Sequence, residues 1–313
     1  MGKIGFLFAG QGAQAIGMGE DLFNNREECR EVFLEGEKIL EMDLLNKMFN
    51  GSEEELTKTK IAQPAIVLTS IAAAKALESE GIKADYSCGL SLGEYSALIN
   101  ENIISFEDGL KLVKERGRIM DFFGEKTKGK MAAILKLKED KIDELIQRCS
   151  EYGIVQVANY NCPGQTVIGG EVAPIDKSIE IAKELGGMGI PLKVSGAFHT
   201  SLLDEASEEF YNEIKKINLN KIESNIYSNL KGELYVEEDN LQEILKKHMV
   251  KPVYLEKIIR DMISNGVDIF IEIGPGKTLS GFVKKIDRGV KVFNVHNLDS
   301  LKTCIEEVKN SNN

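Results

Sequence analysis

Residues 89–93 read Gly-Leu-Ser-Leu-Gly, a G-x-S-x-G pattern, and this stretch constrains the fold more than any other part of the chain. In that pattern a serine occupies a sharp turn between a strand and a helix, and the glycines let the backbone bend and neighbouring elements approach. Residues 84–88 are short and apolar enough to end a strand, and residues 92–99 carry apolar side chains at helical spacing. The sequence therefore predicts a strand–turn–helix unit with Ser91 at the turn.

Ser91 is a candidate nucleophile because of where that turn would place it. A residue at the start of a helix lies near the positive end of the helix dipole, beside backbone N–H groups that have no partner within the helix. Such groups can stabilise the oxyanion that forms when a carbonyl group is attacked. The alternative is a tight turn that merely contains a serine, because short patterns of this kind also arise by chance.

The charge and the cysteine and histidine content exclude several classes of function. The chain of 313 residues carries a net charge of −11, whereas a nucleic-acid binder needs a basic face. Its five cysteines include no C-x-x-C pair, so we expect a reducing compartment and neither a zinc site nor a disulfide framework. A catalytic base of the histidine type has to be one of three residues: His199, His248 or His296.

No stretch of the sequence is typical of a membrane span or a targeting segment. The longest apolar run, 65–77, is interrupted by two hydroxyl residues and a lysine, and it is shorter than the ~20 residues that cross a bilayer. Residues 4–8 are too short to be the hydrophobic region of a signal peptide. We therefore expect a soluble, cytoplasmic protein without a membrane partner.

Two glycine-rich loops match nucleotide-binding motifs only in part. Residues 10–15 read G-x-G-x-x-A after a predicted strand, but no second strand ending in an acidic residue follows about 20 positions on. Residues 274–278 include Gly-Lys-Thr, but a phosphate-binding loop would need glycine at the position of Ile271. We interpret the second loop as a turn, and the first as a loop that brings backbone N–H groups and Gln11 close to a bound molecule.

The order of predicted elements divides the chain into two domains. The first part contains a long helix predicted to begin at Gln63 and Pro64, because proline suits the first turn of a helix. Residues 127–195 are predicted to form β-α-β-β-α-β, the ferredoxin-like order. We therefore predict an α/β fold with a larger domain, formed by residues 1–126 and 196–313, into which residues 127–195 are inserted as a smaller domain.

One arginine and the three histidines occupy positions that suggest chemistry. Residues 106–123 are predicted to form a helix whose apolar stripe includes Arg116. An arginine on an apolar face needs an anion, and the residues alone favour an internal carboxylate over the carboxylate of a substrate. His199 lies at the predicted domain junction, in a loop that can face a cleft. His248 is predicted at the end of a helix, where a cation suits the dipole, and His296 follows a strand.

Seven short stretches in a fixed order resemble one enzyme family. They are Gly10 to Gln14, Gln63 with Pro64, Gly89 to Tyr95, Arg116 with Gly117, Asn159 to Gln165, Gly196 to His199, and Ile273 to Gly276. As a set they resemble the malonyl-CoA:acyl carrier protein transacylases of type II fatty acid synthesis. The resemblance covers about residues 4–298.

The resemblance implies an α/β-hydrolase-like main domain with a parallel sheet, a ferredoxin-like insert, and an active site in the groove between them. It implies that Ser91 is acylated, and that His199 is its general base and then the acid for the leaving thiolate. Arg116 would bind the malonyl carboxylate as a bidentate pair, in place of the internal partner favoured above. The backbone N–H groups of Gln11 and Leu92 would form the oxyanion hole.

The resemblance also implies roles for further residues. The residues expected to line the substrate pocket are Gln63, Asn159, Asn161 and Phe198. The ring of Phe198 is expected to crowd an α-methyl branch, and so to favour malonyl over methylmalonyl groups. The main-chain carbonyl of His248 is expected to orient the catalytic histidine, at a position where we expect glutamine in the family. Leu90 stands where histidine is common, and we expect it to pack beneath the turn.

The implied reaction has malonyl-CoA as donor and the phosphopantetheine thiol of acyl carrier protein as acceptor. We expect no metal, no redox cofactor, no nucleic-acid partner and a monomeric protein. Three alternatives stay open. One is a stand-alone acyltransferase of a polyketide pathway, and another is a non-catalytic module that binds CoA or a carrier protein. The third is a hydrolase that uses Ser91 with His296 and an acid such as Asp268 or Glu272.

Overall fold

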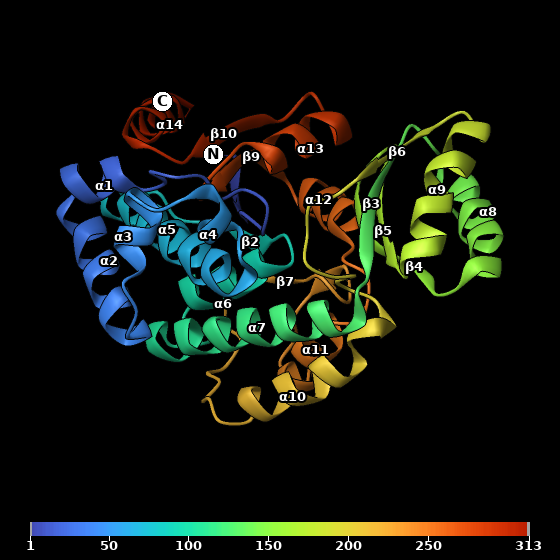
Figure 1. Ribbon diagram of the computed structural model, residues 1–313. Coiled ribbons are helices and arrows are strands. Elements are labelled where there is room, and N and C mark those ends of the chain that lie inside the picture. The colour runs from blue at the N-terminus through green and yellow to red at the C-terminus, as the bar shows by residue number, and fades with distance from the viewer. Residues whose placement is uncertain (1, 312–313) are drawn as a thin grey trace.

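The computed structural model describes residues 2–311 and contains two larger β-sheets surrounded by helices (Figure 1). The first sheet has the strand order β10-β9-β1-β2, and every neighbouring pair in it is parallel. Its strands are β1 (Lys3–Phe8), β2 (Tyr86–Gly89), β9 (Val267–Ile273) and β10 (Lys291–Val295). The α/β class and the parallel sheet predicted from the sequence are therefore confirmed.

Helices cover both faces of the parallel sheet, which explains why most residues of β1, β2 and β9 are buried. Successive side chains of β1 point to opposite faces. Phe6 and Phe8 join the core cluster that contains α5 and α6, whereas Leu7 joins the cluster that contains α12 and α13. The helices of this part are α1 (Glu20–Asn25), α2 (Glu27–Leu40), α3 (Leu44–Phe49), α4 (Glu53–Thr57), α5 (Thr59–Ser79), α6 (Leu92–Asn100), α7 (Phe106–Thr127), α10 (Asp204–Ile214), α11 (Leu241–His248), α12 (Leu255–Ser264), α13 (Thr278–Ile286) and α14 (Leu298–Ser311).

The second sheet is antiparallel and is built by one continuous segment, at the right of Figure 1. Its strand order is β4-β5-β3-β6, with two helices on one face. In chain order the elements are β3 (Lys130–Leu135), α8 (Glu139–Cys149), β4 (Val155–Cys162), β5 (Gln165–Gly170), α9 (Val172–Glu184) and β6 (Met188–Pro191). This segment has an apolar core of its own, in which Ile134 and Ile168 of the sheet pack against Leu145 and Ile181 of the helices.

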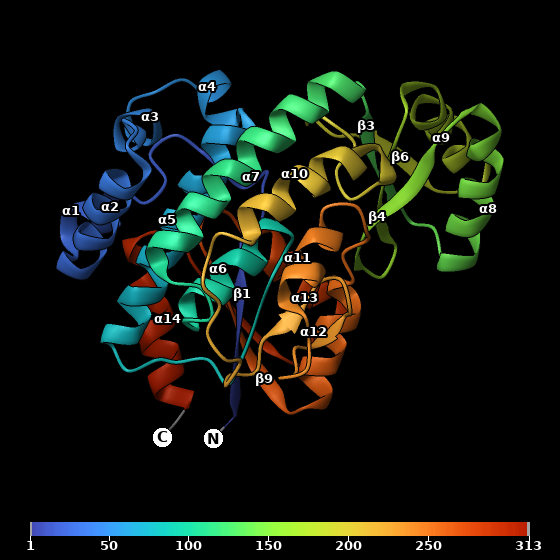
Figure 2. The ribbon, with the colours of Figure 1, turned by 90° about the horizontal axis from the view of Figure 1, so that it is seen from below.

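The small sheet is joined to the rest of the protein both along the chain and by main-chain hydrogen bonds. Figure 2 shows α7 running from the main part toward β3, with α10 beside it. The outer strand β4 also pairs with the main part, because the N–H of Tyr160 donates to the carbonyl of Val253 at 2.8 Å and the N–H of Val253 donates to the carbonyl of Ala158 at 2.9 Å. A short hairpin of β7 (Tyr227–Ser228) and β8 (Glu233–Leu234) lies near the end of β2.

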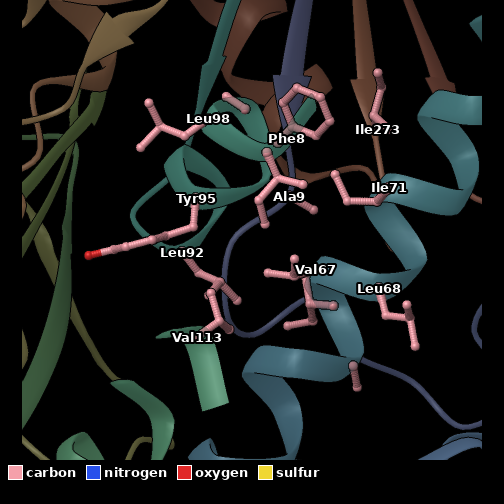
Figure 3. Packing of buried hydrophobic residues seen from close by; sticks show 14 of the residues in the cluster. Phe8, Ala9, Val67, Leu68, Ile71, Leu92, Tyr95, Leu98, Val113 and Ile273 are labelled. Atoms are coloured by element: carbon pink, nitrogen blue, oxygen red, sulfur yellow. The ribbon is translucent and has the colours of Figure 1, made fainter. Parts of the chain in front are cut away.

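The helix α5 is the centre of the larger core. It is long and apolar enough to cross a membrane, but 89% of the candidate span is buried inside the protein, so we interpret it as a core helix. Figure 3 shows Ile71 of this helix near Ala9, at the end of β1, and Val67 on the side of the helix that faces Leu92 of α6. This packing fixes α6 against the sheet edge at which the turn that contains Ser91 lies.

The predicted start of this long helix at Gln63 and Pro64 is wrong, because α5 begins at Thr59 and Pro64 lies inside it. The reason is a cap supplied from another helix. The carboxylate of Asp121 in α7 accepts hydrogen bonds from the N–H of Thr59 at 3.1 Å and of Lys60 at 2.9 Å. These are N–H groups of the first turn, which have no partner within a helix.

Candidate active site

The predicted strand–turn–helix unit is confirmed, with Ser91 between β2 and α6. Ser91 has φ 52° and ψ −99°, a backbone conformation that is unfavourable for a residue with a side chain. A Cβ atom at Gly89 would lie 2.0 Å from the carbonyl carbon of Gly93, and one at Gly93 would lie 2.1 Å from the carbonyl oxygen of Phe8. Both glycines of the motif are therefore required by close backbone packing.

Asn229, which the sequence did not single out, clamps this turn. Its Oδ1 accepts a hydrogen bond from the N–H of Ser91 at 2.7 Å, and its Nδ2 donates to the carbonyl of Gly89 at 2.7 Å. Asn229 is fully buried and follows β7. Its two side-chain bonds hold the unfavourable conformation of Ser91 in place.

The side chain of His199 contacts the Ser91 hydroxyl directly. Nε2 of His199 lies 2.7 Å from Oγ of Ser91, and Nδ1 lies 2.7 Å from the main-chain carbonyl of His248. A carbonyl can only accept, so Nδ1 carries the proton and donates, and Nε2 is left to accept from the hydroxyl. The two side chains come from segments 108 positions apart in the sequence.

The environment of His199 keeps the imidazole neutral. Burial, followed by the positive charge of Arg116, lowers the pKa of His199 to about 4, although its hydrogen bond to the carbonyl of His248 acts in the opposite direction. A neutral imidazole at neutral pH is the form that can accept a proton from Ser91.

Arg116 points its guanidinium at the same hydroxyl. Nη2 of Arg116 lies 3.3 Å from Oγ of Ser91, the side chain is buried, and the guanidinium carbon lies 5.1 Å from the centre of the Tyr95 ring. Within residues 2–311 no carboxylate oxygen lies within 4.0 Å of Arg116, and Nε has no hydrogen-bond partner. The internal ion pair that the residues alone favoured is therefore wrong. Burial lowers the pKa of Arg116 from its usual value, and the charge is available to an anion in the site.

A cavity of about 260 Å³ opens in front of Ser91 and His199. Of the predicted pocket residues, Asn159, Asn161 and Phe198 lie on its wall, and so does Leu90, which also packs against the apolar cluster that contains Tyr86 and Cys88 of β2. Oδ1 of Asn161 is buried without a hydrogen-bond partner among the residues that the structure describes. The wall thus combines apolar surface with amide groups that can bind a polar substrate.

Gln63 lies one layer behind this wall. Its Nε2 donates to Oε1 of Gln11 at 3.1 Å and lies 3.2 Å from the sulfur of Met120, and both of those residues line the cavity. The main-chain N–H groups of Gln11 and Leu92 have no acceptor among residues 2–311. Leu92 itself is fully buried in the first turn of α6.

Comparison with known proteins places this arrangement in a family. The family model described as acyl transferase domain matches residues 5–311. The chain belongs to the acyl transferase domain family. The malonyl CoA-acyl carrier protein transacylase of Bacillus subtilis (strain 168) is 39% identical over 314 residues, which cover 100% of this chain and 99% of that protein. The protein of the same name from Staphylococcus aureus (strain MSSA476) is 40% identical and covers 96% of this chain and 98% of its own length.

Solved structures agree with this assignment of the acyltransferase. The crystal structure of malonyl CoA-acyl carrier protein transacylase from Clostridium perfringens ATCC 13124 has a TM-score of 0.95 and 48% identity, and covers 99% of this chain and 98% of that one. A malonyl-transacylase in complex with a type II PKS acyl-carrier protein has a TM-score of 0.93 and 29% identity, and the match covers 97% of this chain and 99% of that one.

The acyltransferase does not have the arrangement that a Ser91–His296 hydrolase requires. The ring of His296 contacts the side chain of Asn294, with 2.5 Å between Nδ1 and Nδ2, and lines a separate surface hollow. Both carboxylate oxygens of Glu272 accept hydrogen bonds from main-chain N–H groups at the start of α13. The base in contact with Ser91 is His199 instead.

A larger open groove of about 810 Å³ adjoins the cavity of the acyltransferase and shares Gln11, Gly12 and Val194 with it. The groove carries both signs of charge, and its charged residues are Glu54, Lys58, Lys60, Arg118, Asp121, Glu125 and Lys193. Asp121 caps α5, and Arg118 pairs with Glu115 and Glu209. The lysines have no ion pair among the described residues, so their charges face the groove unpaired.

Proposed function

We propose that this acyltransferase moves a malonyl group from malonyl-CoA to the phosphopantetheine thiol of acyl carrier protein through a malonyl ester on Ser91. The observation that carries the proposal is the convergence of two groups on one hydroxyl. Nε2 of His199 lies 2.7 Å from Oγ of Ser91, and Nη2 of Arg116 lies 3.3 Å from it. A base and a fixed cation side by side suit a thioester that ends in a carboxylate.

In the first half-reaction, Oγ of Ser91 attacks the thioester carbonyl and His199 takes the hydroxyl proton on Nε2. The unpaired N–H groups of Gln11 and Leu92 stabilise the oxyanion. When the carbon–sulfur bond breaks, His199 returns the proton to the leaving thiolate, so CoA departs as a thiol. In the second half-reaction, the carrier's thiol gives its proton to His199 and attacks the ester, and Ser91 regains its proton.

Arg116 binds the far carboxylate of the malonyl group in this proposal. Two parallel N–H···O bonds to a guanidinium are strong and directional. Nη2 already faces Ser91, and Nε is buried without a partner, which supports a carboxylate as the missing ligand. Phe198, on the cavity wall, limits the room for an α-methyl branch. Gln63, through Gln11, keeps this side of the site in position.

The remaining sequence-based expectations fit the same proposal. The unpaired lysines of the larger groove suit the phosphates of CoA and phosphopantetheine, which enter as parts of the substrates. The proposed reaction uses no metal or redox cofactor. The carrier protein is the expected partner, the protein acts as a monomer, and the pathway is cytoplasmic. We assign residues 127–195 to a ferredoxin-like domain and residues 1–126 with 196–313 to an α/β-hydrolase-like domain. The strand order of the small sheet and its separate core support this division.

Intact mass spectrometry tests the proposal. Mixing with malonyl-CoA is expected to add one malonyl group, and adding acyl carrier protein is expected to move that group to the carrier. Loss of the added mass to water, without a carrier, would indicate a hydrolase, and no mass gain would contradict acyl transfer. Comparing the carrier proteins of fatty acid and polyketide pathways as acceptors distinguishes the two pathways.

A further inference from the structure

A buried carboxyl group lies behind Ser91 and His199 and outside the cavity. Glu94 is in the first turn of α6, is fully buried, and is not part of the cavity wall. Carboxyl groups are almost never fully buried without partners. The partners of Glu94 lead in two directions, one to the nucleophile and one to the base.

One oxygen of Glu94 supports the clamp on the nucleophile. Oε1 accepts a hydrogen bond from the hydroxyl of Tyr235 and another, at 3.3 Å, from the N–H of Asn229. Asn229 in turn holds the N–H of Ser91 and the carbonyl of Gly89. The carboxyl group of Glu94 therefore holds Asn229, and Asn229 holds the turn at Ser91.

The other oxygen faces the residue that orients the base. Oε2 of Glu94 lies 3.1 Å from Nδ1 of His248, whose main-chain carbonyl accepts from Nδ1 of His199. The imidazole rings of His199 and His248 have their centres 5.1 Å apart. Oε2 and both ring nitrogens of His248 are buried, and none of the three makes a hydrogen bond within residues 2–311, so the 3.1 Å approach of Oε2 to Nδ1 is a polar contact without hydrogen-bond geometry. Glu94 is thus the polar group against which the ring of His248 rests.

The charges around this contact favour neutral side chains. Burial raises the pKa of Glu94 to about 7, against the opposing effects of its hydrogen bonds and of Arg116. Burial, then His199 and Arg116, holds the pKa of His248 well below its usual value. A protonated carboxyl group can donate to Nδ1 of His248 through one oxygen and accept through the other.

We propose that Glu94 is a positioning residue for acyl transfer, whose carboxyl group fixes both the turn that presents Ser91 and the carbonyl that orients His199. The proposal rests on the function proposed above and goes beyond it, because Glu94 touches neither the substrate nor the reacting atoms. A glutamine can make the same set of contacts without a charge, with its oxygen accepting and its amide donating, whereas an alanine can make none of them.

The test compares the rates at which malonyl-CoA acylates Glu94→Ala, Glu94→Gln and the wild-type protein, by quenched-flow mass spectrometry. We expect Glu94→Ala to lower kcat about 100-fold with little change in KM. The reason is that Ser91 and His199 would be held less firmly, which misplaces Oγ and Nε2 without removing any contact with the substrate. We expect Glu94→Gln to recover the rate to within about threefold of wild type. Asp261→Asn is the matched control. Asp261 lies in α12, and its carboxylate, like that of Glu94, accepts a hydrogen bond from a tyrosine hydroxyl, that of Tyr227, at 2.6 Å. This variant is expected to alter stability without this loss of kcat.

Imidazole NMR gives a readout that does not depend on activity, and the three histidines of the chain make the spectrum simple. The Nδ1 proton of His199 is expected to exchange faster in Glu94→Ala than in wild type, and to be unchanged in Asp261→Asn. Should Glu94→Ala not fold, Tyr235→Phe replaces it, with a slower acylation expected.

A wild-type rate in the alanine variant, or in Tyr235→Phe if that variant stands in, would overturn the proposal. A glutamine variant as slow as the alanine variant would overturn it as well, because charge would then be what residue 94 supplies. Failure of the wild-type protein to be acylated would instead contradict the proposed function.

Discussion

The main-chain carbonyl of His248 lies 2.7 Å from Nδ1 of His199, so the base is oriented by backbone instead of by an acidic side chain. The side chain of residue 248 makes no direct contact in that hydrogen bond, and its ring rests against Glu94 instead. His248→Gln is expected to keep at least about a third of the acylation rate, because the orienting carbonyl belongs to the backbone and a glutamine amide can replace the ring as the polar neighbour of Glu94. Steady-state kinetics with malonyl-CoA checks this, and a loss of more than tenfold would show that the ring itself is needed.

Replacing Ser91 separates catalysis from backbone strain. Both Ser91→Ala and Ser91→Gly are expected to abolish the mass gain with malonyl-CoA. The glycine variant should also be more stable than the alanine variant by about 1 kcal/mol, because glycine tolerates a positive φ that costs other residues on the order of 1–3 kcal/mol. Urea unfolding of the two variants measures the difference, and equal stabilities would mean that the turn at φ 52° is not strained.

Replacing Arg116 is expected to affect malonyl groups selectively. Arg116→Ala should lower kcat/KM for malonyl-CoA roughly 100-fold, the effect of losing hydrogen bonds to a charged group worth about 3 kcal/mol. Acetyl-CoA lacks the distal carboxylate, so its slower reaction should fall much less. Measuring both substrates on one variant provides the control. An equal loss for acetyl and malonyl groups would assign Arg116 to the serine instead of the carboxylate.

The rate of acylation should depend on pH through His199. Only the neutral imidazole accepts the proton of Ser91, and its pKa is lowered to about 4. The value of kcat/KM should therefore be constant from neutral pH down to about pH 5 and fall below that as the base is protonated. A profile of malonyl-CoA acylation between pH 3.5 and 8, using short exposures, checks this. A midpoint near the ordinary value of ~6.5 would indicate an exposed imidazole.

The free energy of unfolding should fall as the pH rises, because of Glu94, whereas the acylation rate should fall as the pH drops. Its folded-state pKa, about 7, lies above the ordinary value of 4.5, so the folded protein binds this proton more tightly than the unfolded chain does. The stabilisation is complete below pH 4.5 and is lost as the pH rises through 7, with an upper size of about 3 kcal/mol. Subtracting the unfolding free energies of Glu94→Gln from those of wild type isolates this effect from the histidines. A difference independent of pH would contradict it.

The cap on α5 should contribute to stability from a distance. Asp121→Ala removes the acceptor of two first-turn N–H groups and is expected to cost about 1–2 kcal/mol. Ser105→Ala removes a local cap, the bond from the N–H of Asp108 to the Ser105 hydroxyl at 3.1 Å, and serves for comparison. Denaturant unfolding of both variants measures the two costs. No loss in Asp121→Ala would show that Pro64, not the cap, determines how α5 begins.

The sequence predicted the features that depend on neighbouring residues. The turn at Ser91 was predictable because its glycines and the flanking strand and helix lie within a few positions. The burial of Arg116 was predictable from the apolar stripe of one helix. Asn229 was not, because it lies 138 positions from Ser91 and no local pattern distinguishes it from a surface asparagine. Whether Arg116 has an internal partner was likewise decided by segments far apart in the chain.

Two other differences have the same physical origin. The start of α5 depends on Asp121, which lies 62 positions after Thr59. The local helix signals at Gln63 and Pro64 therefore predicted a start that is too late. Leu90 was expected beneath the turn, and the structure adds that it also lines the cavity, whose other walls come from segments far apart in the chain. Long-range contacts and rare backbone conformations are the information that a single sequence carries least clearly.

The pairing of β4 with Val253 has a consequence for turnover. Its two main-chain bonds tie the wall that carries Asn159 to the part of the protein that carries Ser91. The small sheet consequently cannot swing aside as a lid without breaking them. The wall of the 260 Å³ cavity that carries Asn159 therefore keeps its place beside Ser91 for as long as these two bonds persist.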